Sequence, residues 1–131
     1  MENIKTDTAK KVVLAIDDNP MQLEIFQKIL GEKYNLKTAN SASSAMNYLS
    51  SQADRADIIL LDITMPNISG FEFLKEIRNL LSYMDTPIII VSGNTGEDYI
   101  NEAKNSTAFD VLGKPVSPEV LIKTIERALT V

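Results

Sequence analysis

The 131-residue sequence predicts a single α/β domain of the doubly wound (βα)5 type, in which helices cover both faces of a five-stranded parallel sheet. Five short apolar runs alternate along the chain with segments whose apolar residues recur at helical spacing. Three of the runs, VVLAI, IILL and IIIV, are continuous and rich in β-branched residues, which is typical of strands buried on both faces of a parallel sheet. The length also fits one domain.

The five expected strands are the apolar runs themselves: Val12–Ile16, Tyr34–Ala39, Asp57–Leu61, Pro87–Ser92 and Phe109–Gly113. Parallel neighbours cannot be joined by tight turns, so each connection must cross over the sheet, and right-handed crossovers through helices place helices on both faces. We therefore expect no antiparallel strand.

The connecting segments contain recognisable helix boundaries. Asn19-Pro20 places a capping residue before a proline at the first helical position, Gly31 follows where that helix should end, and Ser117-Pro118 repeats the start signal for the last helix. A second helix should begin at Ser41 or Ser43 and run through Leu49. A third should follow Gly70, and a fourth is expected over residues 96–105.

The apolar faces of these helices follow from the spacing of their large side chains. The expected faces are Leu23, Ile25, Phe26, Ile29 and Leu30 in the first helix, Phe73, Leu74, Ile77, Leu80 and Leu81 in the third, Tyr99, Ile100 and Ala103 in the fourth, and Leu121, Ile122, Ile125 and Leu129 in the last.

The composition excludes several classes of chemistry. The chain has no Cys and no His, which rules out disulfides, thiolate nucleophiles, Ser-His-Asp triads and imidazole metal sites. A metal must then be held by oxygen atoms, which favours a hard cation such as Mg²⁺. The net charge of −5 argues against nucleic-acid binding by this domain.

The ends and the hydropathy of the chain bear on its organisation and location. No apolar run approaches the roughly 20 residues that span a membrane, and the amino terminus lacks the apolar core of a secretory signal. We expect residues 1–10 to form a flexible polar lead-in to a domain over residues 11–131. We also expect a cytoplasmic location and no insertion into a membrane.

Polar residues follow four of the expected strands. They are Asp17 and Asp18 after the first, Asp62 after the third, Ser92 at the end of the fourth and Lys114 after the fifth. In open α/β sheets, ligands bind at the carboxyl ends of the strands. Each residue alone is explained by helix capping or turn chemistry. Three carboxylates together would repel by roughly 1 kcal/mol per pair at 4 Å in water and by about 4 kcal/mol at an effective dielectric of 20, which a divalent cation would relieve.

These residues lie in four segments, VLAIDDNP, IILLDITMPNISG, IIIVSG and FDVLGKP, by which the chain resembles response-regulator receiver domains of two-component phosphorelay signalling, from about Val12 to Leu129. The resemblance implies a flavodoxin-like three-layer sandwich with strand order 2-1-3-4-5. It places the first and fifth helices on one face of the sheet and the other three on the opposite face. It also implies a cis peptide bond between Lys114 and Pro115.

The resemblance further implies roles for the site residues. Asp62 would accept a phosphoryl group from a phosphohistidine on a sensor histidine kinase or a phosphotransfer protein. Mg²⁺ would be held by Asp18, by Asp62 and by the backbone carbonyl of Thr64, with Asp17 acting partly through water. Lys114 and Ser92 would contact the phosphoryl oxygens. The signal would pass by a conformational change to a downstream protein through the fourth helix, fifth strand and fifth helix, and the domain would not be a dedicated enzyme, although slow self-dephosphorylation is expected.

One position departs from the pattern of the family. Receivers usually have Tyr or Phe three residues before the lysine, where this chain has Val111. Valine is smaller and stiff at χ1, so the usual inward swing of an aromatic ring is not available. Phe109 lies two residues earlier, which would place it on the same face of the strand as Val111.

Three other functions compete with this interpretation. A haloacid-dehalogenase-type phosphatase or phosphotransferase also uses Mg²⁺ and a nucleophilic aspartate, but it needs a second acid two residues later, where this chain has Thr64 or Asn19. A flavin mononucleotide site would need a hydroxyl- and glycine-rich loop in place of DDNPMQ. A degenerate, interaction-only receiver would have lost site residues that are all present here.

Overall fold

The core of the molecule is a parallel sheet of five strands. The structure is a computed structural model, and it describes residues 10–51, 54–66, 68–93 and 96–130 of the chain. The strands of this sheet are β1 (Val12–Ile16), β2 (Asn35–Ala39), β3 (Ile58–Leu61), β6 (Ile88–Ser92) and β7 (Asp110–Gly113). The helices are α2 (Pro20–Leu30), α3 (Ala42–Ser50), α4 (Gly70–Arg78), α5 (Glu97–Lys104) and α6 (Pro118–Leu129). The lead-in expected for residues 1–10 lies, apart from Lys10, outside the described residues.

The strand order is β2-β1-β3-β6-β7, and every neighbouring pair in this sheet is parallel. This is the predicted order 2-1-3-4-5 when the five strands are counted along the chain. The strand order reverses between β1 and β3. These two strands pair directly, and Ile16 at the end of β1 lies opposite Leu61 at the end of β3. In such sheets the binding crevice lies at the carboxyl ends of the strands beside that reversal.

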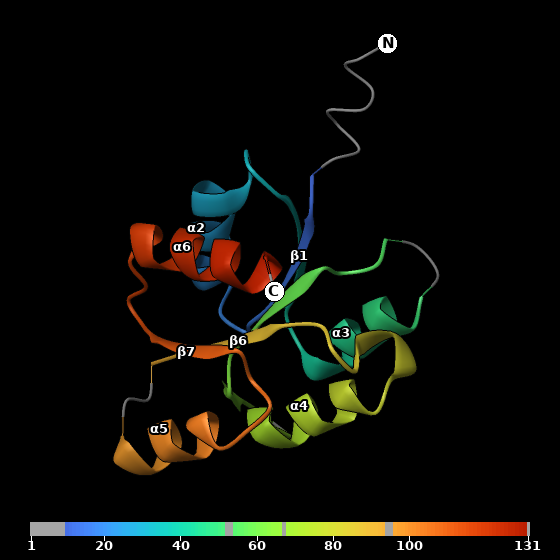
Figure 1. Cartoon of the computed structure of the whole chain (residues 1–131), viewed down its shortest axis with the longest axis vertical. Helices are drawn as coiled ribbons and strands as arrows, with labels where there is room; N and C mark the ends of the chain where they lie inside the picture. Colours follow the sequence, from blue (N-terminus) through green and yellow to red (C-terminus); the bar gives the residue numbers. More distant parts are fainter. Residues whose placement is uncertain (1–9, 52–53, 67, 94–95, 131) are drawn as a thin grey trace.

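Helices cover both faces of the sheet, with α2 and α6 on one face and α3, α4 and α5 on the other (Figure 1). Side chains alternate along β1, so that Leu14 and Ile16 pack under α3 and α4 while Val13 and Ala15 pack under α2 and α6. The predicted three-layer arrangement is confirmed.

Capping side chains begin the helices where the sequence indicates. The side chain of Asn19 accepts a hydrogen bond from the N–H of Met21, with Pro20 at the first helical position. Of the two serines proposed for α3, it is Ser41 that caps the helix. Ser117 caps α6 in the same way.

Three expected core residues are exposed, namely Ile25, Leu81 and Tyr99. Tyr99 lies on α5, where Ala103 is the buried side chain. Ile25 faces solvent because the side of α2 that packs on the sheet runs through Gln22, Phe26 and Leu30, and Ile25 lies about 100° away from it. Leu81 has 87% of its surface exposed, because α4 ends at Arg78 and Leu81 belongs to a separate short 3-10 turn.

A short antiparallel ribbon, absent from our sequence prediction, lies outside the main sheet. Its strands are β4 (Thr64–Met65) and β5 (Ile68–Ser69), which pair with each other alone. The expectation of no antiparallel strand is therefore wrong for this segment. The ribbon folds the chain back directly after Asp62, so that α4 begins beside the end of β3.

Gly70 allows this return at close range. Its N–H donates to the carbonyl oxygen of Ile63 at 3.1 Å, and a Cβ atom at position 70 would lie 2.2 Å from the Cα of Ile63. A backbone atom cannot move aside as the end of a side chain can. Any larger residue must therefore displace either the start of α4 or the segment that follows Asp62.

We predict that Gly70→Ala lowers the free energy of unfolding by about 1–3 kcal/mol, as expected for overpacking a rigid contact. Gly93→Ala is the matched control, because a Cβ atom at Gly93 would meet nothing within 4 Å. Denaturant unfolding of both variants measures the difference. Equal stability of the two variants would show that the contact with Ile63 is not tight.

Candidate functional site

Two neighbouring strands bring the acidic residues together. Asp17 directly follows β1 and Asp62 directly follows β3, and their side chains are almost fully buried, with 1% and 3% of the residue surface exposed. Asp18 is exposed beside them. Each of the three residues offers a carboxylate oxygen within 4.8 Å of the others. The cluster predicted from the sequence is therefore present.

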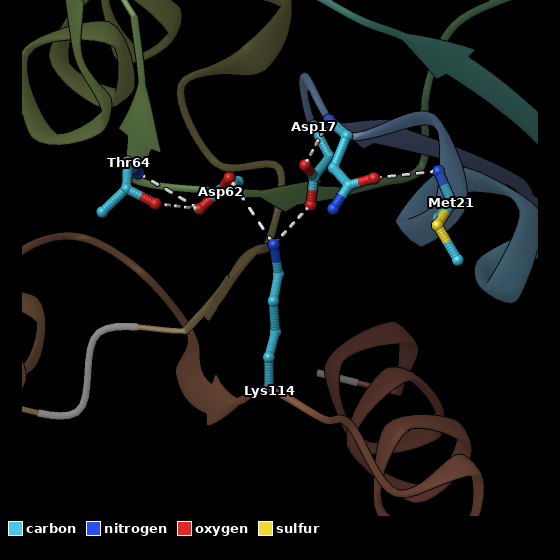
Figure 2. A network of polar contacts seen from close by, with 6 residues as sticks. Asp17, Met21, Asp62, Thr64 and Lys114 are labelled. Carbon is cyan, nitrogen blue, oxygen red and sulfur yellow. Dashed lines mark hydrogen bonds and ion pairs between the residues drawn. The ribbon is translucent and has the colours of Figure 1, made fainter.

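Lys114 reaches this cluster from β7, at the edge of the sheet. Its Nζ lies 2.7 Å from Oδ2 of Asp17 and 3.6 Å from Oδ2 of Asp62 (Figure 2). Only 19% of its side chain is exposed. The peptide bond between Lys114 and Pro115 is cis, as predicted. The ammonium group thus bridges the two buried carboxylates.

The Oδ1 atom of each buried carboxylate accepts hydrogen bonds from a nearby residue, Asn19 or Thr64, which the sequence analysis did not assign to orienting the carboxylates. Oδ1 of Asp17 accepts from the N–H of Asn19 at 2.9 Å. Oδ1 of Asp62 accepts from the N–H of Thr64 at 3.1 Å and from its hydroxyl at 3.0 Å (Figure 2). Both contacts join an aspartate to the residue two positions later, which is the pattern of an Asx turn. That pattern was visible in the sequence.

Ser92 ends β6, the strand between β3 and β7, and is buried. Its carbonyl oxygen accepts from the backbone N–H of Lys114 at 3.0 Å. The structure therefore brings Ser92 to the same edge of the sheet as Asp62 and Lys114. All five residues predicted at the strand ends lie at this edge.

Burial of like charges has an electrostatic cost. Removal from water raises the pKa of Asp17 above its ordinary value of 3.8, and Asp62 adds to the rise, although Lys114 and the N–H of Asn19 act in the opposite direction. Among the described residues, three carboxylates face one ammonium group at this edge. The site is therefore short of positive charge.

The donor set suits a small hard cation. An ion with oxygen ligands at about 2.1 Å holds neighbouring ligand oxygens roughly 3 Å apart and opposite ones about 4 Å apart. One carboxylate oxygen from each of Asp17, Asp18 and Asp62 lies within 4.8 Å of the others, so the three are near enough to share one such ion, and they follow directly from strand ends. Since no His or Cys is present in the chain, oxygen donors are the natural choice, and they fit Mg²⁺.

Val111 and Phe109 point to opposite faces of the sheet. Val111 packs with the cluster under α3, α4 and α5, whereas Phe109 packs with the cluster under α2 and α6. The Phe109 ring lies 5.5 Å from the guanidinium of Arg127. The expectation that Phe109 shares a face with Val111 is wrong, because β7 begins at Asp110 and its alternation does not extend back to residue 109.

Fold and site together define a class: a doubly wound α/β domain whose strand ends hold an acidic cluster and a partly buried lysine. The family model of the response regulator receiver domain matches residues 13–126. The chain therefore belongs to the response regulator receiver domain family, and its role is that of a phosphoacceptor in two-component signalling.

Relatives occur in several kinds of protein. The chain is 34% identical over 110 residues to the two-component response regulator ARR10 of Arabidopsis thaliana and 31% identical over 121 residues to the sensor histidine kinase RcsC of Escherichia coli, covering 83% and 92% of this chain. It spans only 19% and 12% of the lengths of those two relatives.

Among solved structures, the chain is similar to the chemotaxis protein CheY4 of Vibrio cholerae, with 34% identity and a TM-score of 0.83 over 92% of this chain and all of that one. None of the helices in the described part of the chain has the length and apolar character needed to cross a membrane.

The raised pKa of Asp17 predicts a pH dependence in metal-free protein. The folded protein binds this proton more tightly than the unfolded chain does, so the free energy of unfolding should fall as the pH rises from 3.8 through the raised pKa. Asp17→Asn should lack this contribution. Denaturant unfolding of both proteins over this pH range, in chelator, measures it. A difference between the two proteins that grows with pH in favour of wild type would contradict the prediction.

Asp18 offers a cleaner test of repulsion, because it is exposed and makes no hydrogen bond or ion pair with a described residue. We predict that Asp18→Asn raises the melting temperature in chelator by about 1–4 °C, as expected for removing roughly 0.5 kcal/mol of exposed repulsion. Mg²⁺ should then stabilise the variant less than it stabilises wild type. Glu24→Gln, which removes an exposed acid from α2, is the control and should change neither quantity. A variant that melts lower in chelator would show that Asp18 is structural.

Proposed function

We propose that Asp62 is the phosphoacceptor of this domain and that Asp17, Asp18, Lys114, Ser92 and the carbonyl of Thr64 serve the transfer. The observation that supports this best is the bridge made by Lys114, whose Nζ lies 2.7 Å from Asp17 and 3.6 Å from Asp62 in a nearly buried setting. Folding does not require two buried carboxylates at one sheet edge. Phosphoryl transfer does require an acceptor anion next to fixed positive charge.

In the proposed reaction, a carboxylate oxygen of Asp62 attacks the phosphorus atom of a phosphohistidine on a donor protein. An O–P bond forms, the N–P bond breaks, and the imidazole leaves with the electron pair and takes up a proton. No general base is needed to activate a carboxylate nucleophile, because it has no proton to lose. Thr64 holds Oδ1 of Asp62 through its N–H and hydroxyl, which fixes the orientation of the attacking group.

The remaining residues would stabilise the negative charge. Lys114 would pair with a phosphoryl oxygen as a point charge, and the Ser92 hydroxyl would donate to another. Asp17, Asp18, Asp62 and the Thr64 carbonyl would hold Mg²⁺, with Asp17 acting partly through water. When bound, the ion supplies the positive charge that the cluster lacks and offsets the charge of the phosphoryl group.

The partners in this proposal are proteins. Relatives that include a sensor histidine kinase and a response regulator support a histidine kinase or a phosphotransfer protein as the donor. We propose that residues 11–131 act as the receiver unit, that the face formed by α5, β7 and α6 contacts the downstream protein, and that the domain is not a dedicated enzyme. The aspartate-nucleophile phosphatase is disfavoured because Thr64, a hydroxyl residue bonded to Asp62, stands where that class needs an acid.

The test is phosphorylation by acetyl phosphate with Mg²⁺, followed by intact mass spectrometry. Wild type should gain one phosphoryl group, Asp62→Asn should gain none, and chelator should abolish uptake. Lys114→Ala should still accept phosphate but respond less in conformation. Asp98→Asn, on exposed α5, is the matched control and should behave as wild type. Phosphate on Ser92, or uptake that is insensitive to chelator, would contradict the proposal.

A further inference from the structure

A cavity of about 280 Å³ lies between α5 and β7, and its lining includes Ser92. Ile100 and Ala103 line it from the helix, and Val111 lines it from the strand. These three side chains are apolar and only Ala103 is fully buried, so they form an apolar wall of a recess close to the surface, and the charged residues Lys104 and Asp110 also line it. Its lining includes one of the residues proposed to contact the phosphoryl group.

The size of the cavity limits what can fill it. An apolar cavity of about 150 Å³ in another protein accommodates a benzene molecule. A recess of 280 Å³ between α5 and β7 therefore has room for one six-membered ring and the carbon that bears it. The small side chain of Val111 contributes to this space, because it has only three carbons and leaves the space between β7 and α5 open. Val111 itself is half-buried.

The charges around the cavity are not balanced. Asp110 pairs with Arg127 at 2.8 Å, so its charge is compensated within the chain. Lys104 also lines the cavity but makes no ion pair with a described residue. A matching ligand would thus combine an aromatic ring with a carboxylate that can reach Lys104.

The position of β7 favours a polypeptide as the source of that ring. β7 is the last strand in the sheet and pairs only with β6 in the described part of the chain, so its outer edge presents backbone groups without a strand partner. An extended peptide segment can bond to such an edge while its side chains enter adjacent pockets.

We propose that this cavity receives one aromatic side chain, flanked by an acidic residue, from the downstream protein, and that the fit depends on the state of Ser92. The inference rests on the proposed function in one respect: phosphorylation of Asp62 would act on the cavity through Ser92, which belongs to both. A ring supplied by the partner would then occupy the space beside Val111.

The probe is the peptide acetyl-Asp-Phe-Asp-amide, with acetyl-Asp-Ala-Asp-amide as its matched control. Backbone amide NMR titrations of the whole chain are run with Mg²⁺ alone and with Mg²⁺ and beryllofluoride. We expect saturable shifts centred on residues 103–104 and 111–113 with the aromatic peptide only. We also expect its affinity to differ between the two states, because ligands that share a wall residue are coupled.

Two variants locate the binding. Val111→Phe should fill the cavity and weaken the peptide about tenfold, and Lys104→Glu, a surface change that cannot unfold the core, should weaken it severalfold. Ile25→Phe and Lys28→Glu make comparable changes on the exposed side of α2, which covers the opposite face of the sheet from α5, and should leave the affinity unchanged. Equal binding of both peptides, or unchanged binding by Val111→Phe and Lys104→Glu, would overturn the inference.

The two proposals fail in distinguishable ways. If beryllofluoride shifts the amides near Asp62 while the aromatic peptide binds neither state, the cavity inference is wrong and the phosphoacceptor proposal stands. If the peptide binds as expected but acetyl phosphate never modifies Asp62, the proposed function is wrong and the cavity is a docking site of another kind. Peptide affinity that does not change on beryllofluoride loading overturns the coupling through Ser92.

Discussion

The site depends on the gathering of three carboxylates beside one ammonium group, which pairs with two of them. Asp17 and Asp62 are buried side by side because β1 and β3 are neighbours in a parallel sheet, and Lys114 is brought to them from the far strand β7. Removing charges from water is costly, and one lysine cannot compensate three acids. The raised pKa of Asp17 reflects chiefly the removal of its carboxylate from water, to which the neighbouring Asp62 adds. A bound cation would therefore compensate the excess negative charge of the cluster, and it would also allow an anion such as a phosphoryl group to bind there.

The rest of the fold holds this unfavourable arrangement in place. Helices packed on both faces of the apolar strands fix the ends of β1, β3 and β6. The Asx turns of Asp17 and Asp62, closed by the N–H groups of Asn19 and Thr64, orient the two carboxylates. The ribbon after Asp62 and the close approach of Gly70 to Ile63 set the path of the segment that contains Thr64. Stability supplied by the core thus offsets the cost of burying like charges at the functional edge.

The sequence predicted the sheet and the five residues at the strand ends, because continuous β-branched runs and polar residues after them are local patterns. The strand order followed from the resemblance to receiver domains, because no local pattern specifies it. The sequence did not predict which side of a helix meets the sheet to better than one residue, so Ile25 was misplaced. It also did not predict that α4 ends at Arg78, so Leu81 was placed on a helix to which it does not belong. The β4–β5 ribbon and the orientation of Phe109 also escaped prediction, since both depend on where a strand starts or the chain turns back. The cavity beside Val111 depends on packing between α5 and β7, which no local pattern describes.

The central claim is that the cluster lacks positive charge and that Lys114 supplies only part of it. Calorimetric titration of Mg²⁺ into wild type and Lys114→Met tests this most directly. If Lys114 and the cation share the same carboxylates, wild type should bind one Mg²⁺ and the variant should bind it more tightly, because a competing charge 2.7 Å from Asp17 is gone. Absence of Mg²⁺ binding by wild type, or weaker binding by Lys114→Met, would contradict the account.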